Sequence, residues 1–235
     1  MVSAREGLSS GRLVASALRD LVRPPFVTLL ALDLLASLAS VTIGADDIAI
    51  VAVLVLLTIS LYLTIAVVLA AGAEGPEPSA DAWIRAALRR RCFWRLLLAS
   101  LFTIVLIVLG SLGLIVGGII VAGYVGLAQA AAVLERTGPT ESLRRSFELS
   151  RPARAPVAVI ASACILVPTV VLQVGAELDW DDALGWAWIA IVIASRIISI
   201  VGDIALARAF VALGGAPTPS MSELRPPREE RSYGP

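Results

Sequence analysis

Three charged side chains lie inside long apolar stretches of this 235-residue chain, and they are the groups best placed to do chemistry. They are Asp33, Arg196 and Asp203. A charge in hydrocarbon costs at least about 2.5 kcal/mol, so we expect each to face protein or water, and to face one another. Arg196 and Asp203 are seven residues apart and share a helix face. Two interpretations are open: a proton or cation site in which Arg196 holds two carboxylates, or an ion pair that staples helices together.

Composition excludes most other chemistry. The chain has no histidine, and all 19 of its basic residues are arginine. Imidazole bases, imidazole metal ligands and a phosphate-loop lysine are therefore missing. Cys92 follows a polar segment and Cys164 lies in an apolar stretch, so we expect neither a thiolate zinc site nor a disulfide. We predict that the chain is not an enzyme and has no catalytic residues, cofactor or metal of its own.

The elements that position the three charges are predicted to be transmembrane helices. Apolar residues make up 58% of the chain and charged residues only 16%, which is typical of a membrane protein. A helix of about 20 residues crosses the hydrocarbon layer. Residues 96–134 form an apolar run nearly twice that length, so the run must fold back, and a turn at Gly117–Gly118 divides it most evenly. The predicted fold is all-α, with six transmembrane helices at residues 26–44, 48–72, 96–116, 118–134, 155–175 and 185–212.

The placement of arginine predicts the orientation of these helices. Arginines precede the first, third and fifth spans, whereas the connections at 45–47 and 176–183 carry acidic residues and no arginine. Because cytoplasmic loops hold the excess of arginine, both termini are predicted to be cytoplasmic. Three tryptophans near the last span suit the outer interface; they are Trp180, Trp186 and Trp188.

The chain then divides into three predicted parts. Residues 1–25 form a cytoplasmic amphipathic helix, residues 26–213 the membrane domain, and residues 214–235 a disordered, proline-rich cytoplasmic tail. The absence of lysine is typical of a GC-rich prokaryotic genome, so the predicted location is a prokaryotic cytoplasmic membrane.

Three cytoplasmic segments share one plan, at residues 9–24, 79–95 and 140–154. Each starts at Ser or Thr, carries several arginines, can be wound with an apolar stripe, and precedes a pair of spans. Such helices lie flat at the membrane interface. The pattern therefore predicts three helical hairpins, each preceded by an amphipathic helix. Expected partners are the lipid bilayer, its anionic headgroups and a possible cytoplasmic protein, but not nucleic acid.

The third of these segments carries a recognisable motif. A glutamate closes a hydrophobic span, Gly-Pro follows, and a Leu-Arg-Arg-Ser-aromatic helix leads to the next span. The residues are Glu135, Gly138, Pro139, Leu143, Arg144, Arg145, Ser146 and Phe147. This pattern resembles the signature of the membrane domain of glycerophosphoryl diester phosphodiesterase and related six-helix integral membrane proteins. It departs from that signature at Pro152, where glycine is commoner.

The resemblance implies a six-helix membrane architecture. The diesterase activity in the family's name belongs to a separate soluble barrel, which binds its metal through carboxylates and histidine. We do not expect that barrel in this chain, so the resemblance implies no activity here.

Small residues recur every fourth position along the predicted fourth span, at Gly118, Ala122, Gly126 and Ala130. This spacing lets another helix approach closely, either within the molecule or from a second copy. Pro168 is expected to kink the fifth span.

Three functions are compatible with this pattern. The first is a membrane scaffold, assembly or lipid-linked regulatory protein. The second is a small-solute or ion transporter that uses Asp33, Arg196 and Asp203. The third is the membrane subunit of an enzyme whose catalytic chain is separate.

Overall fold

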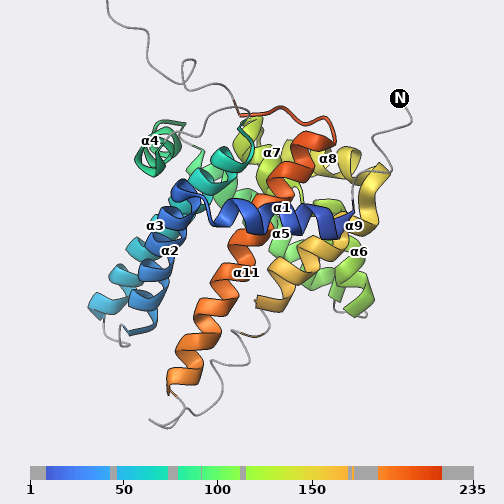
Figure 1. The fold of residues 1–235 in the computed structure, drawn as a ribbon. Helices are drawn as coiled ribbons and strands as arrows, with labels where there is room; N and C mark the ends of the chain where they lie inside the picture. The colour runs from blue at the N-terminus through green and yellow to red at the C-terminus, as the bar shows by residue number, and fades with distance from the viewer. Residues whose placement is uncertain are drawn as a thin grey trace, which may run out of the picture.

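The computed structural model describes residues 9–42, 47–73, 79–90, 92–111, 115–168, 171 and 185–218. Throughout these ranges the chain is all-α, as predicted (Figure 1). Extended chain pairs at one isolated bridge, between Ala73 and Thr218. The predicted connection at 176–183, Trp180 and the chain beyond residue 218 lie outside the described ranges.

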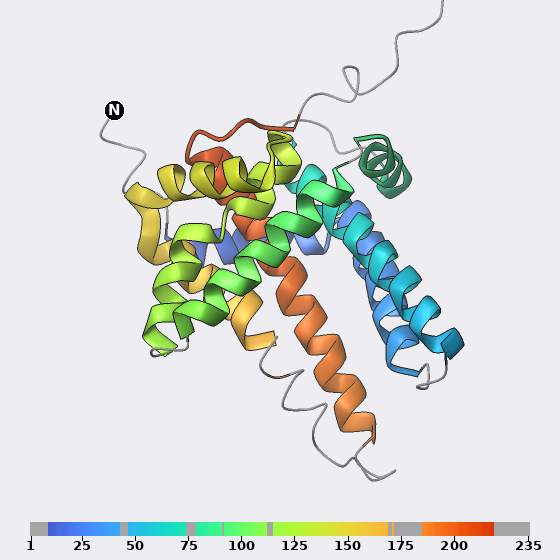
Figure 2. The ribbon, with the colours of Figure 1, turned by 180° about the vertical axis from the view of Figure 1, so that it is seen from behind.

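The helices surround a long central one, α11. In chain order the elements are α1 (Ser10–Leu21), α2 (Pro24–Thr42), α3 (Asp47–Ala71), α4 (Ala80–Arg90), α5 (Phe93–Ser111), α6 (Ile115–Val125), α7 (Ala128–Leu134), α8 (Pro139–Ser150), the 3-10 turn η1 (Arg151–Ala153), α9 (Arg154–Ala161), the π-helical turn η2 (Ser162–Leu166) and α11 (Gly185–Ala212). α2 packs along α3 and α5 packs along α6, while α11 contacts α1, α2, α3, α7 and α9 (Figures 1 and 2).

Three stretches of the described helices are long and apolar enough to cross a membrane: Leu54–Ala71, Gly117–Leu134 and Trp186–Ala212. α1 and α2 pass the same test only as a pair, bent by 85° at their junction, which raises the number to four at most. α5 has a shorter apolar stretch, Phe93–Ile107. Length and composition thus support a membrane protein with three or four such helices among the described residues. The six predicted spans stay a prediction.

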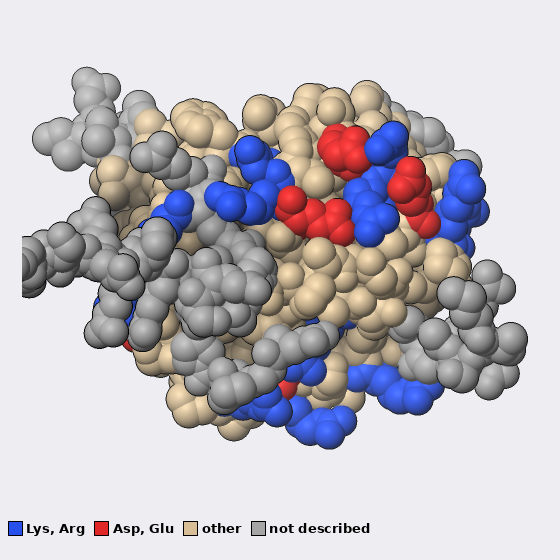
Figure 3. Space-filling view, turned by 90° about the horizontal axis from the view of Figure 1, so that it is seen from above, with Lys and Arg blue, Asp and Glu red and all other residues tan. Residues whose placement is uncertain are grey.

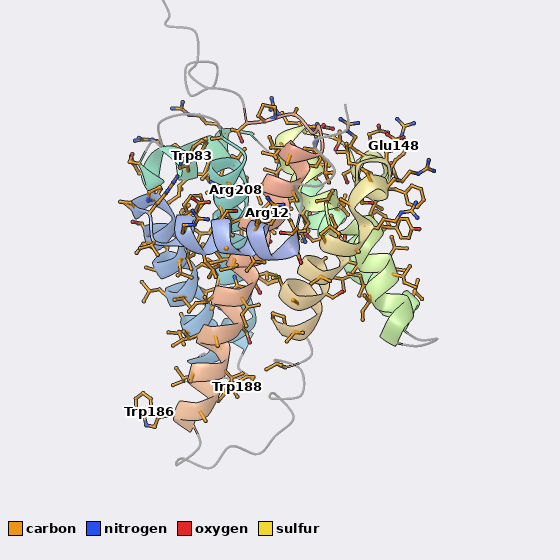
Figure 4. The ribbon with its side chains drawn as sticks, turned by 45° about the vertical axis from the view of Figure 1, so that its right-hand side comes forward. Arg12, Trp83, Glu148, Trp186, Trp188 and Arg208 are labelled. Atoms are coloured by element: carbon orange, nitrogen blue, oxygen red, sulfur yellow. The ribbon has the colours of Figure 1, made fainter. Side chains whose placement is uncertain are left out.

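The three predicted amphipathic segments form α1, α4 and α8. The backbone N–H of Arg12 donates to the Ser9 hydroxyl at 3.3 Å, which caps α1, and Pro139 occupies the first turn of α8. α4 and α8 lie at one end of the molecule, where arginines and acidic residues gather on the surface (Figure 3). Trp186 and Trp188 lie at the opposite end of α11, far from Arg208 (Figure 4).

The chain does not turn at Gly117–Gly118 as predicted. α5 ends at Ser111 and α6 begins at Ile115, so both glycines lie inside α6. A Cβ atom on Gly117 would lie 2.2 Å from the carbonyl oxygen of Gly110, which belongs to α5. Gly110 and Gly117 therefore let the backbones of α5 and α6 come into contact.

The predicted fourth span is broken instead between α6 and α7, at Gly126 and Leu127. The Ser146 hydroxyl of α8 bridges the break: it donates to the carbonyl oxygen of Tyr124 at 2.7 Å and accepts the N–H of Leu127 at 3.1 Å. Backbone groups that the break frees are thereby satisfied in apolar surroundings. A Cβ on Gly126 would lie 2.9 Å from the Ala161 Cβ of α9, so this part of the small-residue ladder packs inside the molecule.

The close contact of α5 and α6 predicts that Gly117→Ala lowers the free energy of unfolding. The new methyl group would meet the Gly110 carbonyl at 2.2 Å, so the helices must separate. We expect a loss of about 1–3 kcal/mol in the free energy of unfolding, measured by denaturation in detergent micelles. Gly11→Ala is the matched control, because a Cβ at Gly11 meets nothing within 4 Å. Equal stability of the two variants would contradict the close crossing.

Candidate functional site

Two of the three intramembrane charges meet in the structure. The Arg196 guanidinium of α11 donates to both carboxylate oxygens of Asp33 on α2: Nε lies 2.9 Å from Oδ2, and Nη2 lies 2.6 Å from Oδ1 and from Oδ2. The Ser60 hydroxyl of α3 donates to Asp33 Oδ1 at 2.7 Å and accepts from Arg196 Nη2 at 2.7 Å. The three residues form a closed cluster, named here the Asp33–Ser60–Arg196 cluster, that ties α2, α3 and α11 together.

The cluster is well suited to its apolar surroundings. The Asp33 side chain is only 3% exposed, so an unpaired carboxylate there would be costly. The forked guanidinium neutralises the charge and Ser60 occupies a further lone pair. The charge of Arg196 is therefore balanced by Asp33.

A polar cavity of about 240 Å³ opens beside this cluster, between helices that are otherwise apolar. Its polar lining comes from α3, α5, α7, η2 and α11. The lining residues are Leu57, Ser60, Leu61, Thr64, Ser100, Gln129, Cys164, Arg196, Ser199 and Asp203.

Asp203 is the carboxylate of this cavity. It lies two helical turns beyond Arg196 on α11, about 10 Å along the axis, and among the described residues no arginine pairs with it within 4.0 Å. The predicted triad is thus divided: Asp33 holds the arginine, and Asp203 faces the cavity. Three or more acidic or cysteine side chains do not gather as metal ligands anywhere in the described ranges.

The wall opposite Asp203 is shaped by a π-helical turn. Pro168 has no N–H to offer the Cys164 carbonyl four residues back, and the preceding turn widens so that the Val167 N–H bonds the Ser162 carbonyl. A Cβ on Gly202 would lie 2.1 Å from the Cβ of Cys164, so this glycine allows η2 to press against α11. π-helical turns are frequent at functional sites.

The family-signature residues lie at the charged end, away from the cavity. Arg145 donates through Nε to both Glu135 oxygens at 3.2 Å and through Nη2 to the Gly214 carbonyl at 3.3 Å. Glu135 also accepts the backbone N–H of Ala216 at 3.2 Å. Glu135 and Arg145 thus hold the chain that follows α11.

That chain, residues 213–218, forms a strap across the ends of the helices. Thr218 donates its N–H to the Gly72 carbonyl at 2.9 Å and its hydroxyl to the Leu69 carbonyl at 2.7 Å, which caps the end of α3. Together with the contacts of Glu135 and Arg145, the strap joins α3, α7, α8 and α11. Three of these helices line the cavity.

Sequence reasoning did not single out the neutral polar residues of the site. Ser60 and Thr64 are spaced four apart in an apolar span, which places them on one helix face and is a signal that could have been used. Gln129 carries no comparable signal, because its place in the cavity depends on which helices lie opposite.

Comparison of the chain with protein-family models, curated proteins and solved structures found no match. The resemblance of residues 135–147 to the membrane domain of the phosphodiesterase family stays a prediction. The case for a function therefore depends on the site.

The closed cluster predicts that Asp33→Ala costs about 3–5 kcal/mol of unfolding free energy, because Arg196 would be left buried without its carboxylate. The paired replacement Asp33→Leu with Arg196→Met is expected to recover most of this loss, because it removes both charges at once. Denaturation in mixed micelles measures both.

The matched control is Arg85→Ala. Arg85 pairs with Asp81 at 2.6 Å, but the two side chains are 63% and 61% exposed, so we expect a change below about 1 kcal/mol. If Asp33→Ala is as mild as this control, the cluster does not hold the helices together.

Proposed function

We propose that the chain is a multi-pass protein of a prokaryotic cytoplasmic membrane, with six spans in three hairpins and both termini in the cytoplasm. The gathering of arginines at the end that holds α4 and α8 supports this orientation (Figure 3). Trp186 and Trp188 at the far end of α11 suit the outer interface (Figure 4). The packing of α2 on α3 and of α5 on α6 supports the hairpins.

Within this architecture we propose a small-solute or ion transporter whose ligand is a small cation or cationic solute. One observation carries the proposal: Asp203 lines a polar cavity among apolar helices while Arg196 is taken up by Asp33. An ionisable residue inside a membrane protein marks a substrate or ion pathway by default. A structural staple needs the Asp33–Ser60–Arg196 cluster, but it needs neither Asp203 nor the cavity.

The charges of the site favour a cation. With both carboxylates ionised, Asp33, Arg196 and Asp203 sum to one excess negative charge. Hydroxyl and amide oxygens from Thr64, Ser100 and Gln129 share the cavity with the carboxylate, and such oxygens are the ligands that hard cations prefer. The volume of about 240 Å³ has room for several water molecules beside an ion.

Asp203→Asn tests this proposal. In proteoliposomes under proton, sodium or potassium gradients, the wild type is expected to carry a cation flux, and the variant to lose at least about 90% of it, because the amide removes the charge that attracts the cation. Ion-sensitive dyes inside the vesicles measure the flux. Asp81→Asn is the control, because Asp81 lies on the exposed face of α4.

A wild type that carries no flux under any of these gradients, or an Asp203→Asn variant that carries full flux, would contradict transport. The scaffold or assembly function is the second candidate. The end of the molecule that holds α4 and α8 favours it, because it offers a charged surface to a cytoplasmic partner (Figures 1 and 3). It gains support if the protein carries no flux and co-purifies with a partner in mild detergent.

A further inference from the structure

Two arginines at the corner between α8 and α9 are held by stacking on aromatic rings. The Arg151 Cζ lies 5.4 Å from the centroid of the Phe147 ring, and the Arg154 Cζ lies 4.6 Å from that of Tyr124. The two rings stack on each other with centroids 4.7 Å apart and planes 16° apart. The four side chains form one ladder, Arg151–Phe147–Tyr124–Arg154, in which each guanidinium lies over a ring.

Among the described residues, no carboxylate neutralises either ladder arginine. Arg85, Arg144 and Arg145 each have one within 2.6, 2.7 and 3.2 Å respectively. In the part of the chain that the structure describes, Arg151 and Arg154 have none within 4.0 Å. Glu148, which is close in sequence, lies 4.0 Å from Arg144 instead.

Arg144 is correspondingly bound to its acidic neighbours. Its hydrogen bond to Glu141, followed by the charges of Glu141 and Glu148, raises the pKa of the Arg144 guanidinium above its usual value. It therefore differs in pairing from the ladder arginines, which lie at the corner that follows its helix, α8.

The predicted topology places the ladder where the cytoplasmic segment meets the fifth span. Arg151 follows α8 and opens η1, and Arg154 begins α9, near the start of the predicted fifth span. Apolar side chains beside them face outward: Phe147 is 41% exposed and Val159 is 56% exposed. A surface that combines exposed apolar groups with unpaired cations fits the boundary between headgroups and acyl chains.

We propose that Arg151 and Arg154 bind the phosphate of an anionic phospholipid of the cytoplasmic leaflet. The proposal depends on the membrane orientation given above, but not on transport. The guanidinium fork matches two phosphate oxygens, and stacking on a ring leaves its N–H donors free to make that contact. An arginine side chain that is already held over a ring loses less conformational freedom when the headgroup binds than a free side chain would.

Native mass spectrometry of the purified chain in neutral detergent tests this site. Phosphatidylglycerol and phosphatidylcholine are added in turn, and the bound fraction of each is measured. We expect the wild type to retain phosphatidylglycerol, and Arg151→Gln with Arg154→Gln to bind it about tenfold or more weakly. The control, Arg85→Gln with Arg144→Gln, changes the net charge by the same amount and should bind like the wild type.

A second variant keeps every charge. Phe147→Leu removes the ring that holds Arg151, and it is expected to weaken phosphatidylglycerol binding several-fold, while circular dichroism shows an intact helical fold. Asp203→Asn should bind lipid normally, so a failure of transport and a failure of lipid binding are distinguishable.

Three results would overturn the proposal. One is equal loss in the paired-arginine control, which would indicate diffuse attraction. Another is full binding after both ladder arginines are replaced. The third is displacement of the lipid by millimolar inorganic phosphate, which would make the site one for a free anion.

Discussion

A guanidinium group cannot remain in hydrocarbon without a partner, and this constraint shapes both the end and the middle of the protein. At one end, arginines are collected on α4 and α8, and Arg85, Arg144 and Arg145 pair there with acidic residues on the same or adjoining segments. In the apolar middle, Arg196 pairs with Asp33 and Ser60 through Nε and Nη2. Because those residues belong to three helices, α2, α3 and α11 must meet at one depth.

Backbone N–H and carbonyl groups in apolar surroundings also need hydrogen-bond partners. At two places in the described chain a nearby side chain takes over the freed hydrogen bonds: Ser146 at the break between α6 and α7, and Thr218 at the end of α3. The π-helical turn before Pro168 solves a similar problem by moving the hydrogen bond one residue along. These irregular points are also where the cavity and the strap are built, so the departures from regular helix give the bundle its polar features.

Part of the fold could be predicted because hydropathy and helix capping depend on residues that are close together in the sequence. Hydropathy predicted an all-α chain, and Ser9, the predicted start of the first amphipathic segment, is the N-cap of α1. The meeting of Asp33 with Arg196 could be anticipated, since neither charge is tolerated alone. The role of Gly117 could not, because glycine permits both a turn and a close helix crossing, and only the facing helix decides. The partners of Ser146 and Gln129 depend on tertiary contacts for the same reason.

The placement of arginine predicts that this chain crosses a membrane an even number of times. Reporter fusions test it most directly: a green fluorescent protein or alkaline phosphatase domain is attached before residue 9, inserted at residue 113, or attached after residue 218. The account predicts fluorescence from both terminal fusions and phosphatase activity only from the insertion at 113. Opposite compartments for the two ends, or a cytoplasmic residue 113, would contradict it.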